Sequence, residues 1–293
     1  MSVARAWLLA VRPKTLPAAV APVLLGLAVA REGGPIADGP AIATLLGALL
    51  LQIASNLAND VFDNEKGADR ADRVGPTRVV STGLLSASNV KLGLAAVLFL
   101  ALCVGAYLIG VAGTPIAIIG IAAAISAIAY TAGPFAFAYH GLGEVFVFIF
   151  FGPVAVAGTV YIQTRYLSGL AWLAGISQGA LAVNILVVNN LRDRAEDERA
   201  GKRTLAVRFG ERFCLIQYCT MLAVAYLVPI AWWGLARTSG LILAPLLSLP
   251  FALGVFRKVC QIRGAGLNTV LARTAQIVLI FSLLFATGIV ASS

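Results

Sequence analysis

Charged residues are scarce in this sequence, and hydrophobic residues are unusually common. Of the 293 residues, 12% are charged and 60% are hydrophobic. An ordinary soluble domain is roughly 45–50% apolar and about 25% charged. A soluble protein of this composition would expose large apolar patches, and an intrinsically disordered chain needs the opposite balance. The composition therefore excludes both classes and predicts a polytopic membrane protein.

Cysteine, histidine and acidic residues are also few. The four cysteines form no Cys-x-x-Cys pair and show no metal-ligand spacing, so they indicate small core residues rather than a disulfide framework. The chain has 22 Lys and Arg residues against 13 Asp and Glu, for a net charge of +9. In a membrane protein such an excess faces anionic membrane lipid, so it does not indicate a nucleic-acid partner.

Long apolar runs are what the sequence has in abundance. A spanning helix needs about 20 apolar residues. Nine stretches come close to this length: residues 15–30, 40–58, 90–110, 114–133, 143–162, 169–190, 213–234, 239–256 and 272–291. None alternates in polarity as a transmembrane β-strand does. The runs predict an all-α membrane protein with about nine transmembrane helices, organised as a single integral-membrane domain over residues 1–293.

The first of these runs is the weakest, because Pro17 and Pro22 interrupt it. An alternative interpretation is a cleaved signal peptide that ends with the small residues 28–30. Against this alternative, Arg12 and Lys14 fall in the middle of what should be the apolar region of such a peptide. We therefore expect a first membrane span.

The distribution of Lys and Arg predicts the orientation of the chain. With nine spans, all but three of the 22 basic residues fall on the side that holds the N-terminus; the exceptions are Arg31, Arg165 and Arg237. Basic residues gather on the cytoplasmic side of a membrane protein. We therefore expect a protein of the bacterial cytoplasmic membrane with its N-terminus inside and its C-terminus outside.

Most of the acidic residues lie in two short segments, each at the predicted cytoplasmic end of an apolar run. The two segments carry similar patterns, Asn56-x-x-x-Asp60-x-x-Asp63 and Asn189-x-x-x-Asp193-x-x-x-Asp197. Spacings of three and four place side chains on one face of a helix. Each helix end should therefore present an amide and two carboxylates in a column at the membrane surface.

Two such columns facing each other would form an oxygen-rich site for Mg²⁺, with the four aspartates as metal-binding and catalytic residues. Basic residues accompany both patterns, among them Lys66, Arg73, Arg78, Lys202 and Arg203. Carboxylates with nearby Lys and Arg suit a metal-bound diphosphate, and the apolar helices suggest that this diphosphate belongs to a lipid. We expect Lys202 and Arg203 to contact the diphosphate. A solvated loop of mixed charge is the alternative.

The segment 130–144 should form the next loop on the same side of the membrane. It is rich in glycine and aromatic residues, and its candidates for substrate contact are Tyr130, Tyr139, His140 and Glu144. The two tyrosines serve either as interfacial anchors or as rings that face a cationic intermediate. Similarly, Arg12 and Lys14 precede the first run as positive-inside anchors or as contacts for an anionic substrate.

Taken together, these residues resemble the UbiA superfamily of intramembrane prenyltransferases, and within it the branch that acts on 1,4-dihydroxy-2-naphthoate in menaquinone synthesis. The stretches that carry the resemblance are 12–17, 59–63, 66–69, 73–78, 130–144, 189–193 and 197–205. The resemblance covers essentially the whole chain. The sequence departs from the superfamily's NDxxDxxxD pattern at Gly67, where the third acidic residue would fall. Asp69, two residues further on, is therefore a further candidate metal ligand.

The resemblance implies nine helices around a central cavity that opens laterally to the bilayer. It implies Mg²⁺ as cofactor, a polyprenyl diphosphate as donor and 1,4-dihydroxy-2-naphthoate as acceptor, with the acceptor's carboxylate replaced by the prenyl group. It also implies that Asp60, Asp63, Asp193 and Asp197 hold the metal. The asparagines beside them join the substrate-binding candidates: Asn56, Asn59 and Asn189.

Three alternatives stay open at this point. The same aspartates would serve a related prenyltransferase that acts on 4-hydroxybenzoate, homogentisate, a chlorophyllide or haem. An ion-coupled transporter also carries repeated acidic motifs, although its ion site should lie near the middle of the bilayer. A CDP-alcohol phosphotransferase pairs aspartates at a helix end, but the Asp-Gly and Ala-Arg residues that precede them in that family are absent here.

Overall fold

The computed structural model describes residues 2–68 and 74–292, and every regular element in these two ranges is a helix. The α-helices are α1 (Val3–Val11), α2 (Pro17–Arg31), α3 (Asp38–Glu65), α4 (Ala87–Ala112), α5 (Thr114–Ala129), α6 (Gly143–Phe151), α7 (Pro153–Thr164), α8 (Gly169–Arg199), α9 (Leu205–Ala236), α10 (Leu249–Gln261) and α11 (Leu267–Ser292). Four 3₁₀ segments join them: η1 (Pro13–Thr15), η2 (Phe137–Tyr139), η3 (Gly240–Ser248) and η4 (Gly264–Gly266). The predicted all-α class is confirmed.

Each predicted apolar run has a helix in the structure, but not all of these helices have the full length of a span. Over the described residues, 7 helical segments are long and apolar enough to cross a membrane. The pair formed by Val3–Thr15 and Pro17–Arg31, bent by 47°, makes an eighth. The remaining run corresponds to the shorter apolar helix α5. The expectation of about nine spans is therefore slightly high by the criterion of length.

Two helices continue beyond their apolar runs and carry the acidic patterns with them. The run ending near residue 58 belongs to α3, which ends at Glu65, and the run ending near residue 190 belongs to α8, which ends at Arg199. Both acidic patterns are therefore helical, as their spacing predicts. The carboxylates are carried on rigid helix ends rather than on loops.

Proline and glycine explain where the spans are broken. Pro153 has no backbone N–H to donate and begins α7 directly after Gly152, so the span Gly143–Thr164 consists of two short helices. Within α9, Gly210 has a φ of 79°, which interrupts the helix near its start. The span Gly240–Gln261 begins as 3₁₀ helix and contains Pro245.

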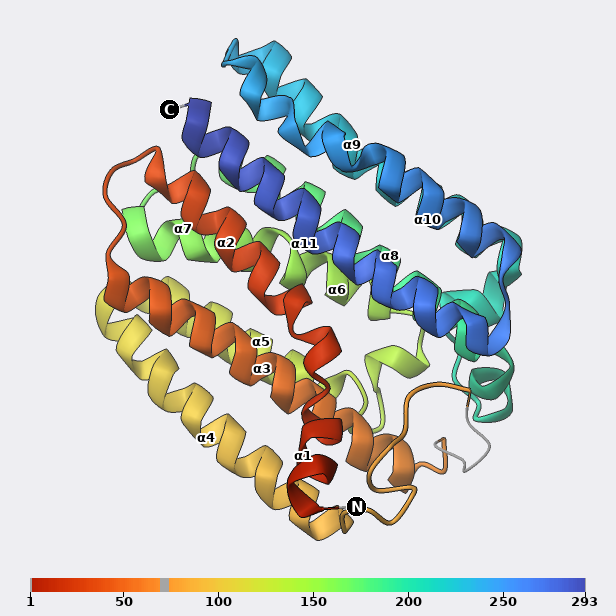
Figure 1. Ribbon diagram of the computed structural model, residues 1–293. Coiled ribbons are helices and arrows are strands. Elements are labelled where there is room, and N and C mark those ends of the chain that lie inside the picture. The colour runs from red at the N-terminus through yellow and green to blue at the C-terminus, as the bar shows by residue number, and fades with distance from the viewer. Residues whose placement is uncertain (1, 69–73, 293) are drawn as a thin grey trace.

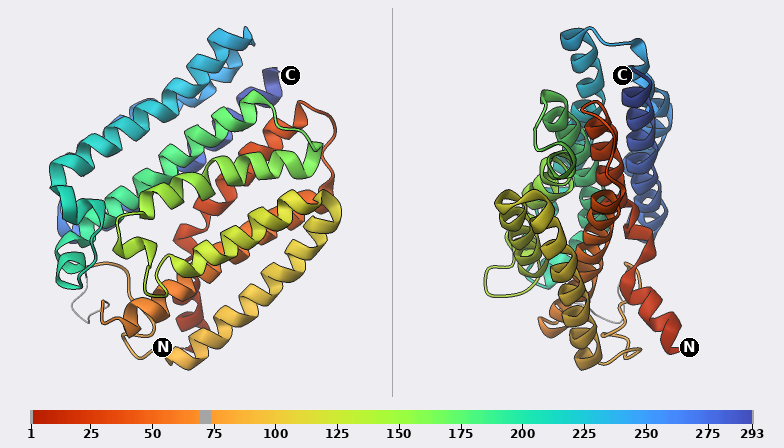
Figure 2. Two further views of the ribbon diagram at one scale, coloured as in Figure 1. Left: turned by 180° about the vertical axis from the view of Figure 1, so that it is seen from behind. Right: turned by 90° about the vertical axis from the view of Figure 1, so that its left-hand side faces the viewer.

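The helices run roughly along one diagonal and α2 lies in the middle of the bundle (Figure 1), in contact with α3, α7, α8 and α11. Seen edge-on, α4 and α5 lie toward one side of the molecule and α10 and α11 toward the other (Figure 2). The loops after α3, α5 and α8 gather at one end of the bundle, which is also the end where α1 lies. The acidic helix ends are thus brought together by the topology.

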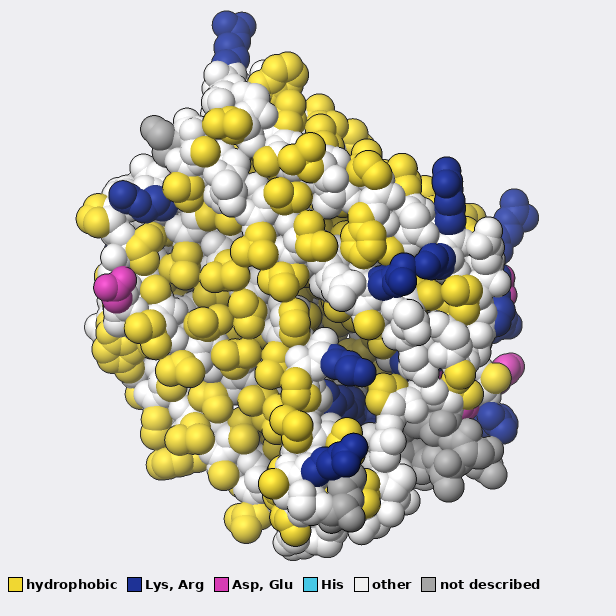
Figure 3. Space-filling model, in the orientation of Figure 1, with side chains coloured by type: hydrophobic (Ala, Val, Ile, Leu, Met, Phe, Trp, Pro, Cys, Tyr) yellow, Lys and Arg dark blue, Asp and Glu magenta, His cyan; other side chains and the backbone are white. Residues whose placement is uncertain are grey.

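The outer surface separates apolar from basic regions (Figure 3). Hydrophobic side chains cover most of the face shown, whereas Lys and Arg gather toward its lower and right-hand parts, around a hollow. Exposed residues such as Leu92, Phe99 and Leu102 on α4 would be costly in water. Such a surface is suited to lipid, with the basic end at the membrane boundary.

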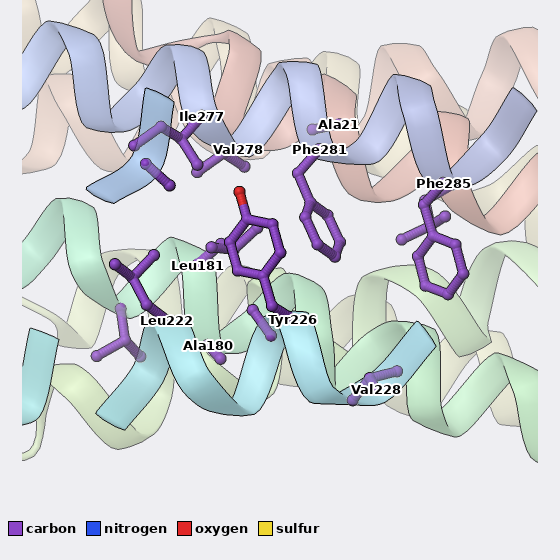
Figure 4. Close-up of a cluster of buried hydrophobic side chains, with 14 of the residues drawn as sticks. Ala21, Ala180, Leu181, Leu222, Tyr226, Val228, Ile277, Val278, Phe281 and Phe285 are labelled. Carbon is purple, nitrogen blue, oxygen red and sulfur yellow. The ribbon is translucent and has the colours of Figure 1, made fainter. Parts of the chain in front are cut away.

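The main core lies between α2, α8, α9 and α11 (Figure 4). Phe281 and Phe285 of α11 point toward α8 and α9, and the ring of Tyr226 meets Phe281 edge-on at a centroid distance of 5.1 Å. The Tyr226 hydroxyl pairs with Ser248 Oγ at 2.7 Å, so its polar atom is satisfied inside the core. This half of the bundle forms a well-packed scaffold for α8.

Candidate active site

Three of the predicted catalytic carboxylates are buried at the basic end of the bundle. Asp60 and Asp63 on α3 are 0% and 2% exposed, and Asp193 on α8 is 3% exposed. Asp197, one turn further along α8, is half-buried. A buried carboxylate must be paired with a cation or hydrogen-bonded several times. The partners of these aspartates therefore define the site.

Asp60 holds the chain that follows α3. Its two carboxylate oxygens accept hydrogen bonds from the backbone N–H groups of Val79 and Val80, at 3.3 and 3.0 Å. Arg12 forms an ion pair with the same carboxylate at 3.5 Å. Asp60 therefore fixes residues 74–80, which we call the strap, and fastens the start of the chain to α3.

Asp63 is the point at which three separate segments meet. It accepts from the Tyr139 hydroxyl at 3.0 Å and forms ion pairs with Lys202 at 2.9 Å and Arg78 at 3.4 Å. Lys202 follows α8, so the basic residue of the second acidic segment reaches the carboxylate of the first. The contact between Lys202 and Asp63 thus brings the two acidic segments together, as the sequence predicts.

Asp193 is held by its neighbour in sequence, Arg192, through two hydrogen bonds of 2.6 and 2.7 Å. The same buried guanidinium donates to Asn189 Oδ1 at 2.8 Å and to Asn268 Oδ1 at 2.9 Å. Arg192 therefore links the second acidic pattern to the start of α11. A planar guanidinium suits this role, because it presents several donors in a fixed geometry.

Both acidic patterns hold the strap. At its start, the Val74 N–H donates to Glu196 Oε1 at 2.7 Å and the Val74 carbonyl accepts from Asn268 Nδ2 at 3.0 Å. At its other end, Val79 and Val80 are bonded to Asp60. The strap thus connects the ends of α3 and α8.

This arrangement predicts a long-range effect of Asn268. We expect Asn268→Leu to speed amide exchange at Val79 and Val80 by about two- to tenfold, because the lost hydrogen bond to the Val74 carbonyl contributes about 0.5–1.5 kcal/mol. Hydrogen–deuterium exchange of the strap is the measurement. Thr269→Val, at the exposed neighbouring position, is the matched control. Exchange that is unchanged in Asn268→Leu would contradict the coupling through the strap.

The loop after α5 bridges the two acidic helix ends. The Lys66 ammonium donates to the carbonyls of Thr131 and Gly133 at 2.8 and 3.0 Å, while Arg208 of α9 donates to the carbonyl of His140 at 3.0 Å. Lys66 also lies 4.4 Å from the centroid of the Tyr139 ring. Desolvation lowers the pKa of Lys66, Asp63 opposes this effect, and Lys202 adds to it.

Tyr130 lies where the bridging loop meets the interior of the bundle. Burial raises the pKa of its hydroxyl, and the charges of Glu144, Asp63 and Asp197 act in the same direction. Tyr130 stays a neutral phenol at physiological pH, able to donate a hydrogen bond.

An apolar cavity of about 660 Å³ begins at this point and extends between α2, α3, α4, α5, α6 and α7. Its walls are mainly aliphatic side chains, with Phe146 and Phe150 of α6 among them. Tyr130, Asn56 and Asn59 supply polar atoms near the acidic end. The cavity therefore has an apolar body and a polar end, where Asn59 directly precedes Asp60 on α3, consistent with the cavity that the sequence resemblance implies.

The other predicted site residues are placed as follows. Asn56 donates to the Val11 carbonyl and Thr15 Oγ, both at 2.9 Å. Asn59 accepts from Thr131 at 3.0 Å. Glu144 accepts from Asn190 at 2.9 Å, and both of these residues are buried. Lys14 and Arg203 are exposed, and Asn189 is half-buried.

Two candidates, Asp69 and Arg73, lie outside the described residues. The sequence interpretation also missed several residues that organise the site. Arg192 and Asn190 lie within the recognised stretch 189–193 and could have been included on that ground. Asn268 and Arg208 carry no such signal.

The donor set at this end of the bundle fits Mg²⁺ in kind, because carboxylate and amide oxygens are the protein ligands that this ion accepts. Within residues 2–68 and 74–292, no three acidic, His or Cys side chains converge closely enough to hold a metal ion as they stand. Instead Arg12, Lys202, Arg78 and Arg192 contact the carboxylates. A bound metal cation would take the place of these positive side chains at the aspartates. An anionic ligand that arrives with the metal would then become the partner of the displaced Lys and Arg side chains.

Fold and site together define the class: an integral membrane protein of helices with a mixed acidic and basic site at the mouth of an apolar cavity. The chain belongs to the UbiA prenyltransferase family, which matches residues 19–290. This finding confirms the family indicated by the sequence motifs.

Individual relatives agree with this assignment. A protein of Haemophilus influenzae named 1,4-dihydroxy-2-naphthoate octaprenyltransferase is 36% identical over 295 residues, covering 97% of this chain and 95% of the relative. A protein of the same name from Mycobacterium tuberculosis is 40% identical over 227 residues, 75% of each chain. A solved UbiA homologue from Archaeoglobus fulgidus, bound to DMAPP and Mg²⁺, is similar in fold with a TM-score of 0.70 and 16% identity, covering 98% of this chain and 99% of that one.

Proposed function

We propose that this protein transfers a polyprenyl group from an allylic polyprenyl diphosphate to 1,4-dihydroxy-2-naphthoate. The diphosphate and the acceptor's carboxylate are lost, and the product is demethylmenaquinol, an intermediate of menaquinone biosynthesis. The observation that carries this function is the similarity along nearly the whole chain to proteins named for the same reaction, at 36% identity in the Haemophilus influenzae relative. The geometry of the site supports each part of it.

The apolar cavity supports binding of the donor's polyprenyl tail. Its volume of about 660 Å³ and its aliphatic walls suit an extended hydrocarbon chain. The polar end of the cavity, which Asn59 lines next to Asp60, supports a position for the head of such a lipid near the carboxylates. A donor that enters tail-first therefore brings its diphosphate to the basic end of the bundle.

The carboxylates are assigned to the metal. We assign Asp63, Asp193 and Asp197 to Mg²⁺. Asp60, which the sequence also assigned to the metal, is instead engaged by the N–H groups of Val79 and Val80 and by Arg12, so we assign it to anchoring the strap. When bound, Mg²⁺ stabilises the negative charge that develops on the departing diphosphate. Lys202 and Arg78, which already reach Asp63, are placed to neutralise the remaining phosphate oxygens.

Loss of diphosphate from an allylic donor leaves a cationic carbon that water would destroy. The aliphatic walls of the cavity are poor partners for water, which favours transfer to the acceptor over hydrolysis. Aromatic rings line the same region, with Phe146 and Phe150 stacked at a centroid distance of 6.1 Å and Tyr130 beside them. Such rings stabilise a nearby cation through their faces.

We place the site at the cytoplasmic face of the bacterial inner membrane, with the N-terminus on the same side. The gathering of Lys and Arg at the end of the bundle that carries the acidic helix ends supports this orientation (Figure 3). It also suits the reaction, because a water-soluble naphthoate would reach the site from the cytoplasm while the lipid donor arrives from the bilayer.

The test is a transfer assay in membranes that contain the protein. We expect prenylated product from 1,4-dihydroxy-2-naphthoate, a polyprenyl diphosphate and Mg²⁺, and no product when EDTA is added. Parallel reactions with 4-hydroxybenzoate as acceptor should give none. Product from 4-hydroxybenzoate alone would keep the reaction type and reject the acceptor.

A further inference from the structure

A second pocket lies at the same end of the bundle, where the bridging loop meets the chain that follows α8. It has a volume of about 650 Å³, and its lining residues include Lys66, Tyr139, His140, Arg203 and Arg208. No residue is shared between the linings of the two cavities. A lipid tail in the apolar cavity would therefore leave this pocket open to a different ligand.

The charge of the pocket selects an anion. Three of its lining side chains are Lys or Arg and one is His, while no Asp or Glu occurs among its described lining residues. This separates it from the catalytic end of α3, where carboxylates alternate with cations. An anion is attracted here without facing a carboxylate in the wall.

The cations of the pocket are not equivalent. Lys66 and Arg208 already donate to loop carbonyls, so their donors are partly used in holding the loop. Arg203 is exposed; its backbone N–H donates to the Tyr139 carbonyl, and its own carbonyl accepts from Arg208 Nε. Its guanidinium is therefore the group with donors to offer a ligand, and a guanidinium binds a carboxylate through two parallel hydrogen bonds.

The walls of the pocket are suited to a flat ring. Tyr139 and His140 lie side by side in sequence at its edge, and the His140 ring is stacked on Phe135 at a centroid distance of 4.2 Å. Tyr139 also connects the pocket to the catalytic carboxylates, since its hydroxyl donates to Asp63 at 3.0 Å. A ring bound here would lie next to the donor's head.

We propose that this pocket binds the aromatic carboxylate acceptor and that Arg203 receives the carboxylate. The proposal rests on the proposed function and adds to it the site at which the second substrate binds. It assigns the adjacent residues Lys202 and Arg203 to different substrates: Lys202 contacts Asp63 at the donor's head, whereas Arg203 faces the acceptor. This differs from the expectation, drawn from sequence alone, that both contact the diphosphate.

The direct test measures binding without donor or metal. The probe is 1-hydroxy-2-naphthoate, titrated by its fluorescence into the purified full-length protein, with 1-naphthol as a ring that lacks the carboxylate. Arg203→Met should weaken the binding of 1-hydroxy-2-naphthoate by about tenfold or more, since a charge-assisted hydrogen bond contributes about 1.5–3 kcal/mol. Binding of 1-naphthol should not change.

Arg199→Met is the matched control, because Arg199 is an exposed arginine outside the pocket that donates to Ala195 of its own helix. It should bind both probes like the wild type. Equal weakening of both probes in Arg203→Met, or no weakening of either, would overturn the proposal. The proposal would also be overturned if inorganic diphosphate competed with 1-hydroxy-2-naphthoate in the wild type but not in Arg203→Met. Arg203 would then bind the diphosphate that the donor releases.

Kinetics distinguish failure of this proposal from failure of the proposed function. In the transfer assay, Arg203→Met should raise the KM for the naphthoate by about tenfold and leave the KM for the polyprenyl diphosphate unchanged. Wild-type protein that transfers normally, with an unchanged acceptor KM in Arg203→Met, would reject the pocket and keep the function. Wild-type protein that transfers nothing to the naphthoate would reject the function itself.

Discussion

Asp63→Asn is expected to reduce the rate of prenyl transfer by about 1000-fold, because it removes one negative charge from the centre of the donor's binding site. Loss of one well-placed electrostatic group costs about 100- to 1000-fold in rate, and here the same change also weakens metal binding. Asparagine keeps an oxygen that can accept from Tyr139 and Lys202, so the fold should persist. The measurement is kcat at saturating Mg²⁺ and donor.

Glu65→Gln is the matched control for this prediction. Glu65 lies two residues further along α3, but it is exposed and pairs with Lys91 at 2.6 Å. Exposed ion pairs contribute little, so activity should stay close to that of the wild type. Activity of Asp63→Asn within tenfold of the wild type, with the protein correctly inserted, would remove Asp63 from the metal site.

Gly152→Ala is expected to destabilise the bundle by about 3 kcal/mol, the upper end of the usual cost of overpacking. A methyl group at this position would lie 2.5 Å from the carbonyl oxygens of both Gly175 and Phe148, and 2.6 Å from Gly179 Cα. All three atoms belong to the backbone, so no side chain can rotate away. The added methyl should force α7 and α8 apart, which thermal unfolding in detergent would detect.

Gly158→Ala tests the same substitution further along the chain, inside α7, without the clash. No atom lies within 4 Å of the methyl group that would be added there, and Gly158 lines the apolar cavity. We expect the unfolding temperature of this variant to match that of the wild type. If the Gly152→Ala and Gly158→Ala variants were equally stable, the absence of a side chain at Gly152 would not be required for the close packing of α7 against α8.

The helices and the acidic helix ends could be predicted from local sequence alone. Length and apolarity identify the spans, and the spacing of Asn56, Asp60 and Asp63 identifies one helix face, because both signals lie within one continuous stretch of the chain. The ends of the spans were less certain. The apolar run ends near residue 58, whereas α3 continues to Glu65. Apolarity does not mark the end of the helix, because a helix can leave the lipid and continue into a polar region with the same backbone geometry.

The partners of each carboxylate could not be predicted, because they come from distant parts of the chain. Asp60 bonds to backbone N–H groups of Val79 and Val80, which no side-chain pattern records. Asn268 reaches Val74, 194 residues away in sequence. Such contacts depend on how α11 packs in the bundle, and a single amide in a helix of ordinary composition gives no sign of it.

Neighbouring residues with the same charge also proved to have different environments. Lys202 and Arg203 follow the same helix and look alike in the sequence, yet one contacts Asp63 and the other lines the polar pocket. The direction in which each side chain points is set by the backbone after α8, where Gly201 has a φ of 72°. A charge pattern predicts an anion site in this region but not which residue serves which anion.

A structure of the protein with a non-reactive polyprenyl thiolodiphosphate and Mg²⁺ would test the central claim most directly. We expect the polyprenyl tail in the apolar cavity that helices α2 to α7 line. The diphosphate should lie between the ends of α3 and α8, and the metal should be bound by Asp63 together with Asp193 or Asp197. The pocket at Arg203 should remain open. A diphosphate bound at Arg203, or a tail outside the cavity, would contradict the account.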